Sequence, residues 1–199
     1  TLWNRVPRSP FPDRALTKLR YVRTFSLDAD GASPGSLSIS CNNLFAPSTS
    51  AHQPLGFDQY AALYNHYHVK SSYMKATFLP PNNEQDSATD AVICAIYLNN
   101  DITESRSNTA IWEDKTTVMQ PAHGRGSMPT TLMKYYKEDY RFPNDKKDST
   151  HANINAAPSE QTFFDVNVFP MGSNPGQWQV FIEVTYLAEF YERKDLQGS

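Results

Sequence analysis

The sequence is short of several features that mark common protein classes. It has two cysteines, eight glycines, 20% charged residues and no apolar run of about 18 residues. Without such a run, no segment is typical of a membrane-spanning helix, so we expect no membrane insertion. Cys41 and Cys94 both lie in strand-like stretches, and no N-x-[ST] site is present. We therefore expect two buried free thiols rather than a disulfide.

Catalytic signatures are also missing. The chain contains no GxSxG, GxxxxGK[ST], HExxH or CxxC motif, so we expect no enzyme activity and no cofactor. His66 and His68 are two residues apart and would share one face of a strand, a spacing that a cupin-like jelly-roll enzyme could use for a metal. The nearest acidic residues, Asp58 and Glu84, fall in a predicted helix and a predicted loop. The sequence therefore predicts no metal site.

Several residue types are plentiful, and they favour β-structure. The 199 residues include 14 prolines, with 39% hydrophobic and 13% aromatic residues. Abundant Pro, Ser, Thr and Asn without long Ala/Glu/Lys/Leu runs is not typical of a helical protein. An all-β sandwich often reaches this length as one domain.

Alternating apolar residues predict about eight strands. The longest stretch is 177–191, where one face carries Trp178, Val180, Ile182, Val184, Tyr186, Ala188 and Phe190. The strand at 91–98 is apolar on both faces, so we expect a second cover there, which another subunit could provide. No βαβ alternation appears. The pattern predicts an all-β fold: a single antiparallel eight-stranded jelly roll, a two-sheet sandwich, with one short helix and long loops.

The stretch PLGFDQYAALYNHYHVKSSYMKATFLPP, residues 54–81, changes its period halfway. Its first part has helical spacing at Phe57, Tyr60, Ala61 and Tyr64, which predicts a helix over 56–65. Beyond it the apolar residues alternate, on odd positions at first and on even positions later. A β-bulge near Ser71–Ser72 would return both sets to one face, and the alternative is a strand that passes between two contact surfaces.

Basic residues gather at the N-terminal end. Residues 1–23 hold six basic residues and one acidic residue, a balance of +5, while the rest holds 12 basic and 20 acidic, a balance of −8. Cations interleaved with aromatics suit single-stranded nucleic acid, because cations follow the phosphates while rings stack on bases. The candidate nucleic-acid-binding residues are Trp3, Arg5, Arg8, Arg14, Lys18 and Arg20. The alternatives are a solvated basic face, or an arm that Trp3 and Phe11 pin to the domain or to a neighbouring copy.

Two segments carry a resemblance to a known family. GFDQYAALYNHYHVKSSYMKATF resembles a segment of the capsid proteins of circovirus-like, Rep-encoding circular single-stranded DNA viruses (CRESS-DNA viruses). VFIEVTYLAEFYER, at 180–193, resembles the last strand of those proteins. In that family the arm before the first strand is long and very rich in arginine, whereas this chain carries a modest basic segment. The positions that match the first pattern are Tyr60, Tyr64, Tyr67, Val69, Ser72, Met74, Ala76 and Phe78.

The resemblance implies a structural protein. We expect a basic N-terminal arm at 1–16, a jelly-roll capsid domain at 17–191 and a C-terminal tail at 192–199. It implies a homo-oligomer of about 60 copies in an icosahedral T=1 shell around circular single-stranded DNA, found in the virion and assembled in the host nucleus. A host-cell receptor or glycan is a further partner. The alternative function is a carbohydrate-binding, lectin-like jelly roll, in which Trp112 and Tyr97 would form the sugar platform.

Overall fold

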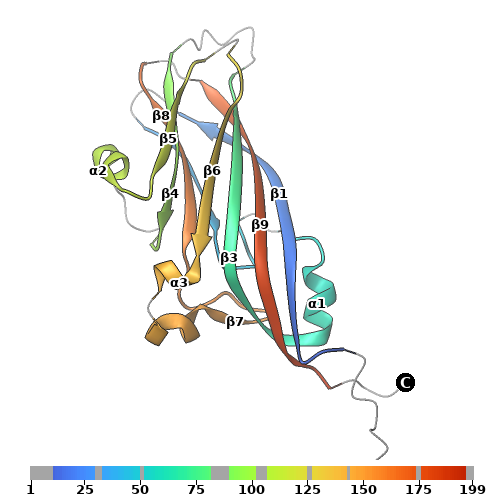
Figure 1. Ribbon diagram of the computed structural model, residues 1–199. Coiled ribbons are helices and arrows are strands. Elements are labelled where there is room, and N and C mark those ends of the chain that lie inside the picture. The colour runs from blue at the N-terminus through green and yellow to red at the C-terminus, as the bar shows by residue number, and fades with distance from the viewer. Residues whose placement is uncertain are drawn as a thin grey trace, which may run out of the picture.

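The computed structural model describes residues 11–29, 33–49, 52–81, 90–101, 107–124, 127–142, 144–173 and 176–195. They form two antiparallel sheets packed face to face (Figure 1). The long sheet has the order β1 (Arg14–Asp28), β9 (Gln177–Arg193), β3 (Tyr64–Leu79) and β6 (Thr130–Lys137), and the short β7 (His151–Asn153) also pairs with β3. The short sheet has the order β2 (Gly35–Ser40), β8 (Phe163–Pro170), β4 (Val92–Asn99) and β5 (Val118–Ala122). The prediction of a jelly roll is confirmed.

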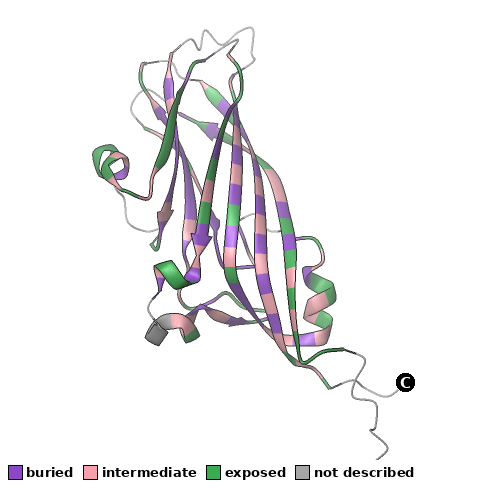
Figure 2. Ribbon diagram, in the orientation of Figure 1, coloured by how far each residue is buried: buried purple, intermediate pink, exposed green. Residues whose placement is uncertain are grey.

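The core lies between the sheets, where the strands turn every second side chain inward (Figure 2). In β9 all seven apolar residues of the predicted face are fully buried. Hydrogen bonds cross this core as well: the Tyr186 hydroxyl donates to the Ser40 carbonyl at 2.9 Å, and Ser72 Oγ donates to the Cys41 carbonyl at 2.7 Å. These bonds satisfy polar groups that would be costly to bury unpaired, and they tie the long sheet to the short one.

The change of period at 54–81 marks a helix followed by a strand, as predicted, but the helix is shorter than the predicted 56–65 because Tyr64 and Asn65 belong to β3. Helix α1 (Phe57–Leu63) follows Gly56, whose φ of 92° is a backbone conformation that favours glycine. In β3, the pairing with β9 shifts register between Val69 and Ser71, which is a β-bulge. Val69 and Met74 are therefore both fully buried although one is odd and the other even. The bulge prediction is confirmed.

Three elements occupy segments that were expected to be loops. They are α2 (Asn108–Glu113), the 3₁₀-helix η1 (Asn144–Thr150) and β7, so the prediction of a single helix and eight strands undercounts both. Helix α3 (Glu138–Arg141) lies instead in a segment with a strand-like pattern. It explains why residues 130–142 look poorly phased, because β6 ends at Lys137 and a helical turn follows. Elements this short contain too few residues to show a period.

The second face of β4 is covered by the chain itself. Helix α2 places Ile111 over Ala95, in a small buried cluster with Tyr97 and Phe169. The Trp112 ring packs edge-on against Phe169, with centroids 5.7 Å apart. The expectation of a second cover is therefore confirmed for this part of β4, and a helix within a predicted loop provides it rather than another subunit.

Two simpler expectations can also be compared with the structure. Cys41 and Cys94 are buried and free, as predicted, and burial raises the pKa of the Cys94 thiol to about 12. Both thiols are protonated at neutral pH and should resist oxidation while the fold is intact.

Among the described residues, none of the helices has the length and apolar character needed to cross a membrane.

Candidate nucleic-acid interface on the long sheet

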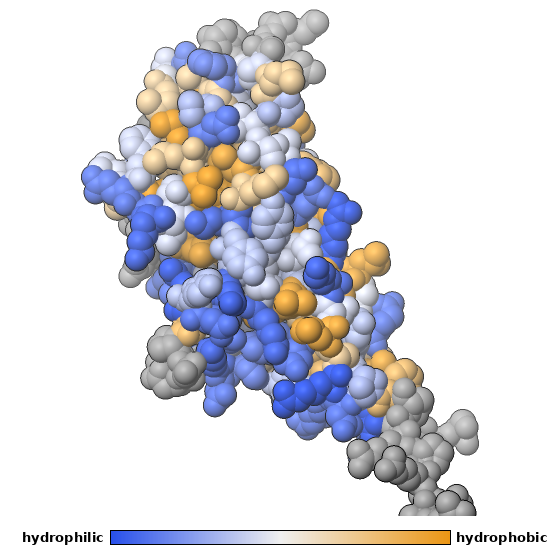
Figure 3. Space-filling view, viewed as in Figure 1, coloured by the Kyte–Doolittle hydropathy of each residue, from blue (hydrophilic) through white to orange (hydrophobic). Residues whose placement is uncertain are grey.

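The outer face of the long sheet carries a group of neighbouring positive charges. We call the following residues the basic face: Arg14, Lys18 and Arg20 of β1, Lys70 and Lys75 of β3, and Glu183 and Glu189 of β9. Five cations and two carboxylates give it a formal charge of +3, whereas the whole chain has −3. Figure 3 views the molecule from this side and shows strongly hydrophilic residues along the sheet, with paler and apolar residues between them. A positive patch on an otherwise acidic chain favours an anionic partner.

Two carboxylates are each shared by two cations. Arg20 bonds to Glu183 Oε1, while Lys75 Nζ lies 3.6 Å from Oε2 of the same residue. The hydrogen bond from Arg20 holds the pKa of Glu183 below its ordinary value. One carboxylate cannot neutralise two cations, so the row formed by Arg20, Glu183 and Lys75 keeps one net positive charge.

Glu189 forms the second row in the same way. Lys70 Nζ lies 2.9 Å from Glu189 Oε2, and Arg14 lies 3.5 Å from Oε1. The hydrogen bond from Lys70 lowers the pKa of Glu189. The Arg14 guanidinium also lies over the Tyr191 ring, 5.9 Å from its centroid. Exposed ion pairs are worth about 0–1 kcal/mol each, so a phosphate could displace a glutamate from either row.

Lys18 lies between these rows and has no ion pair among the described residues. It borders an open cleft of about 390 Å³, which is lined by Lys18, Ser71, Ser72, Tyr73, Tyr135, Thr185 and Leu187. Tyr73 and Tyr135 are directly opposite each other in the pairing of β3 with β6. Their exposed fractions are 37% and 52%, which is high for aromatic side chains on a sheet.

The cleft has the chemistry of a single-strand binding platform. Exposed tyrosine rings can stack on bases of any type, while a neighbouring ammonium group contacts the phosphate. Ser71 and Thr185 add hydroxyl groups that can bond to phosphate or sugar oxygens. The bulge in β3 is what turns Tyr73 outward, because it keeps Met74 in the core.

The structure brings together three of the six predicted nucleic-acid-binding residues. Arg14, Lys18 and Arg20 occupy even positions of β1 and point outward, away from the core residues Leu19 and Tyr21. This strand begins at Arg14, three residues before the predicted start. Trp3, Arg5 and Arg8 lie outside the described residues.

Sequence reasoning missed the other half of this surface. Tyr73, Lys75 and Tyr135 were not proposed as site residues, although Tyr73 and Lys75 alternate with the buried Met74 and Ala76. That alternation could have identified Tyr73 and Lys75 as outward-facing. It could not have shown that Tyr135, on a strand far along the chain, lies beside them.

Residues considered for other functions are placed differently. Tyr97 is 5% exposed and Trp112 packs on Phe169, so the two do not form an open platform for a sugar. His66 stacks on Tyr191 and pairs with Glu192 at 2.9 Å. His68 is buried beneath α3, and its partners are not the acidic residues nearest in sequence.

Comparison with known proteins shows the fold. No protein-family model matches the chain, and no curated protein matches it either. Among solved structures, the BFDV capsid protein in its 60-mer form has a TM-score of 0.54 at 10% identity, with 95% of this chain and 100% of that chain covered. The decameric form has a TM-score of 0.50 at 10% identity, with 90% and 99% covered. A chain of the nora virus structure has a TM-score of 0.51 at 14% identity, with 98% and 69% covered. The chain thus has the jelly-roll fold of viral capsid proteins.

Proposed function

We propose that this chain is a capsid protein that assembles into a small icosahedral shell and packages single-stranded DNA. The observation that carries the proposal is the basic face: an open, net-positive sheet surface with exposed tyrosines on a jelly roll. The fold supports a structural role, since BFDV capsid protein and nora virus share it. No catalytic step is part of the proposed function.

The proposed assembled state rests on the likeness to BFDV capsid protein. BFDV capsid protein, which is a circovirus protein, forms a 60-mer and a decamer. The two segments that resemble circovirus-like capsid proteins lie in α1–β3 and in β9, and β3 and β9 are the central strands of the long sheet. We therefore propose a T=1 shell of about 60 copies, a circular genome, a place in the virion and assembly in the host nucleus.

The genome contact in this proposal is electrostatic and insensitive to sequence. Lys18 and the cations of the two shared rows contact phosphates, and Tyr73 and Tyr135 stack on bases. The basic arm at residues 1–16 contributes Trp3, Arg5 and Arg8 to the same role. Such binding weakens steeply as salt rises, because each phosphate contact releases counterions.

The test is to purify the chain and measure its mass by light scattering, with negative-stain images of the same fractions. The proposal predicts uniform particles of megadalton mass that protect single-stranded DNA from added nuclease. A chain that stays monomeric in the presence of single-stranded DNA, across a range of salt and protein concentration, contradicts it. Particles that protect no nucleic acid would support the shell and refute packaging.

A further inference from the structure

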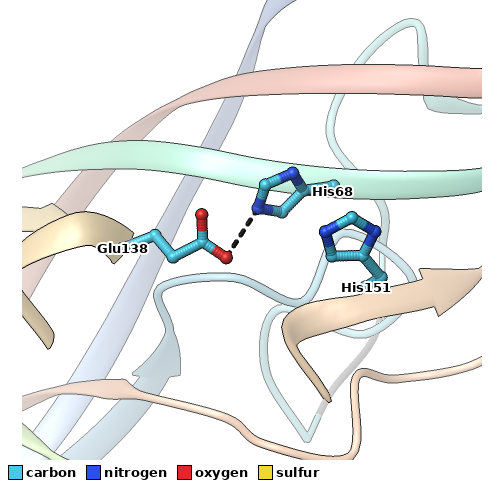
Figure 4. A group of neighbouring side chains, drawn as sticks. All are labelled: His68, Glu138 and His151. Carbon is cyan, nitrogen blue, oxygen red and sulfur yellow. Dashed lines mark hydrogen bonds and ion pairs between the residues drawn. The ribbon is translucent and has the colours of Figure 1, made fainter. Parts of the chain in front are cut away.

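A buried polar cluster lies at one end of the long sheet, away from the cleft that holds Tyr73. It consists of His68 on β3, Glu138 at the start of α3 and His151 on β7 (Figure 4). Their exposed fractions are 7% for His68 and 4% for Glu138, and His151 is half-buried. His68 belongs to the outward side of β3, but the segment from α3 to β7 packs over it and removes it from solvent.

His68 contacts both of the other side chains. His68 Nε2 and Glu138 Oε1 are 2.7 Å apart, and the two imidazole rings stack with centroids 4.1 Å apart. One potential ligand atom from each of the three residues lies within 4.8 Å of the others. These residues come from three separate elements, so the tertiary fold rather than local sequence brings them together.

Further residues hold the cluster in position. Thr150 donates a hydrogen bond to Glu138 Oε1, and His151 Nδ1 bonds to the Tyr191 hydroxyl at 2.9 Å. Metal-binding histidines usually bond through their second ring nitrogen in this way, which fixes the tautomer and the ring orientation. Among the described residues, the hydrogen bonds to Glu138 both end on Oε1. Within the part of the chain that the structure describes, no hydrogen bond therefore ends on Glu138 Oε2.

The chemistry of the three side chains also suits a cation. Two imidazole nitrogens and one carboxylate form a ligand set found at zinc sites.

We propose that His68, Glu138 and His151 bind a zinc ion, with a water molecule in the fourth position. In a tetrahedral site with metal–ligand bonds of about 2.1 Å, neighbouring ligand atoms are about 3.4 Å apart. The His68–Glu138 separation of 2.7 Å is shorter than this value, and the three ligand atoms all lie within 4.8 Å of one another. Binding displaces the proton held between His68 Nε2 and Glu138, gives each of these two residues a bond to the metal instead, and brings His151 closer.

The role of such a site is structural. Zinc would hold α3 and β7 against β3 and so stabilise the segment at this end of the long sheet. Because the unfolded chain does not hold these three groups together, binding stabilises the folded state by mass action. The site lies outside the tyrosine cleft but beside the Glu189 row, since His68 is directly opposite Glu189 and His151 bonds to Tyr191.

The first experiment uses the full chain, stripped with EDTA and dialysed against equimolar Zn²⁺. Metal analysis of the protein should give one zinc per chain, and competition with a chromogenic chelator should give its affinity. The melting temperature should rise on addition of zinc and return to its starting value with excess EDTA. Co²⁺ in place of Zn²⁺ should give the visible absorption bands of a tetrahedral nitrogen–oxygen site.

Matched variants assign the ligands. His151→Gln and Glu138→Gln should each lower zinc affinity at least about 100-fold, beyond the loss expected for an outer-shell partner. His123→Gln is the control, because His123 is exposed and lies outside the cluster. Circular dichroism of each metal-free variant separates a lost ligand from a lost fold.

Two results would overturn the proposal. One is a wild-type chain that binds no zinc under these conditions and shows no change in melting temperature, a measurement that needs no variant. The other is zinc binding that survives His151→Gln and Glu138→Gln in folded protein, or that is lost in His66→Gln instead. Either result would make the cluster a hydrogen-bonded part of the core.

Discussion

The outer faces of the two sheets differ in what covers them. On the short sheet, α2 packs over β4 and closes a second apolar cluster around Phe169. On the long sheet, the middle of the outer face stays open and carries charges, hydroxyl groups and the two tyrosines. A helix covers one face and the other stays exposed, and our proposal places the nucleic acid on the open face.

The largest expected effect concerns the covered face. Phe169→Ala removes a fully buried ring and should lower the free energy of unfolding by about 3–5 kcal/mol. Denaturant unfolding measures this change. Met119→Ala is the control, since Met119 is 44% exposed and should change stability by about 0.5 kcal/mol or less. If the two variants lose equal stability, α2 does not act as a packed cover.

Charge reversal on the open face should have the next largest effect. Replacing Arg14, Lys18 and Arg20 by Glu should weaken binding of single-stranded oligonucleotides on the order of 100-fold at low salt. The slope of log affinity against log salt should fall by about 2, at roughly 0.7 for each phosphate contact. Fluorescence anisotropy over a salt series measures both.

A single-site pair provides the control for that experiment. Lys18→Glu and Lys115→Glu change the net charge equally, but Lys115 lies beside α2, off the basic face. Only Lys18→Glu should lower the salt slope. Equal effects would mean that the affinity follows net charge and that the face has no particular role.

Replacing the two tyrosines tests whether the open face binds bases by stacking. Tyr73→Ala and Tyr135→Ala should each cost about 1–3 kcal/mol of binding free energy if each ring stacks on one base. Tyr→Phe at the same positions keeps the ring and should retain most of the affinity. Phe variants as weak as the Ala variants would assign the effect to the hydroxyl group and reject stacking.

The smallest expected effect comes from a carboxylate of the basic face. Glu183→Gln frees Arg20 and Lys75 and should raise affinity for single-stranded DNA about two- to fivefold.

The lowered pKa of Glu183 also predicts a pH effect on stability. Its contribution is present above the unfolded-state pKa, which is near 4.5, and is lost as pH falls through the lower folded-state pKa. Melting temperatures between about pH 3 and 6 should therefore fall less steeply in Glu183→Gln than in wild type.

The sequence predicts the long elements because their periods extend over many residues. Apolar residues alternate along β9 and β3, and the change of phase in β3 predicts a bulge near Ser71–Ser72, which the structure has between Val69 and Ser71. Helix α2 has six residues, too few to establish a period, so the sequence predicts a second cover for β4 without identifying the element that forms it. Short elements depend on tertiary contacts, which local sequence does not encode clearly.

The candidate sites show the same limit. Arg14, Lys18 and Arg20 share one face of one strand, so their grouping follows from alternation alone. Tyr73 and Tyr135 meet only through the pairing of β3 with β6, and His68, Glu138 and His151 meet only when α3 and β7 fold over β3. Clusters assembled across strands require the topology, and the sequence predicts fold class better than it predicts neighbours.

The most direct test of the central claim is ultraviolet cross-linking of single-stranded oligonucleotides to the purified protein, followed by peptide mapping. The account predicts cross-links on the open face, above all at Tyr73 and Tyr135, that disappear at high salt. Cross-links confined to residues 1–10, or to the α2 side around Trp112, would contradict the assignment of the long sheet as the nucleic-acid interface.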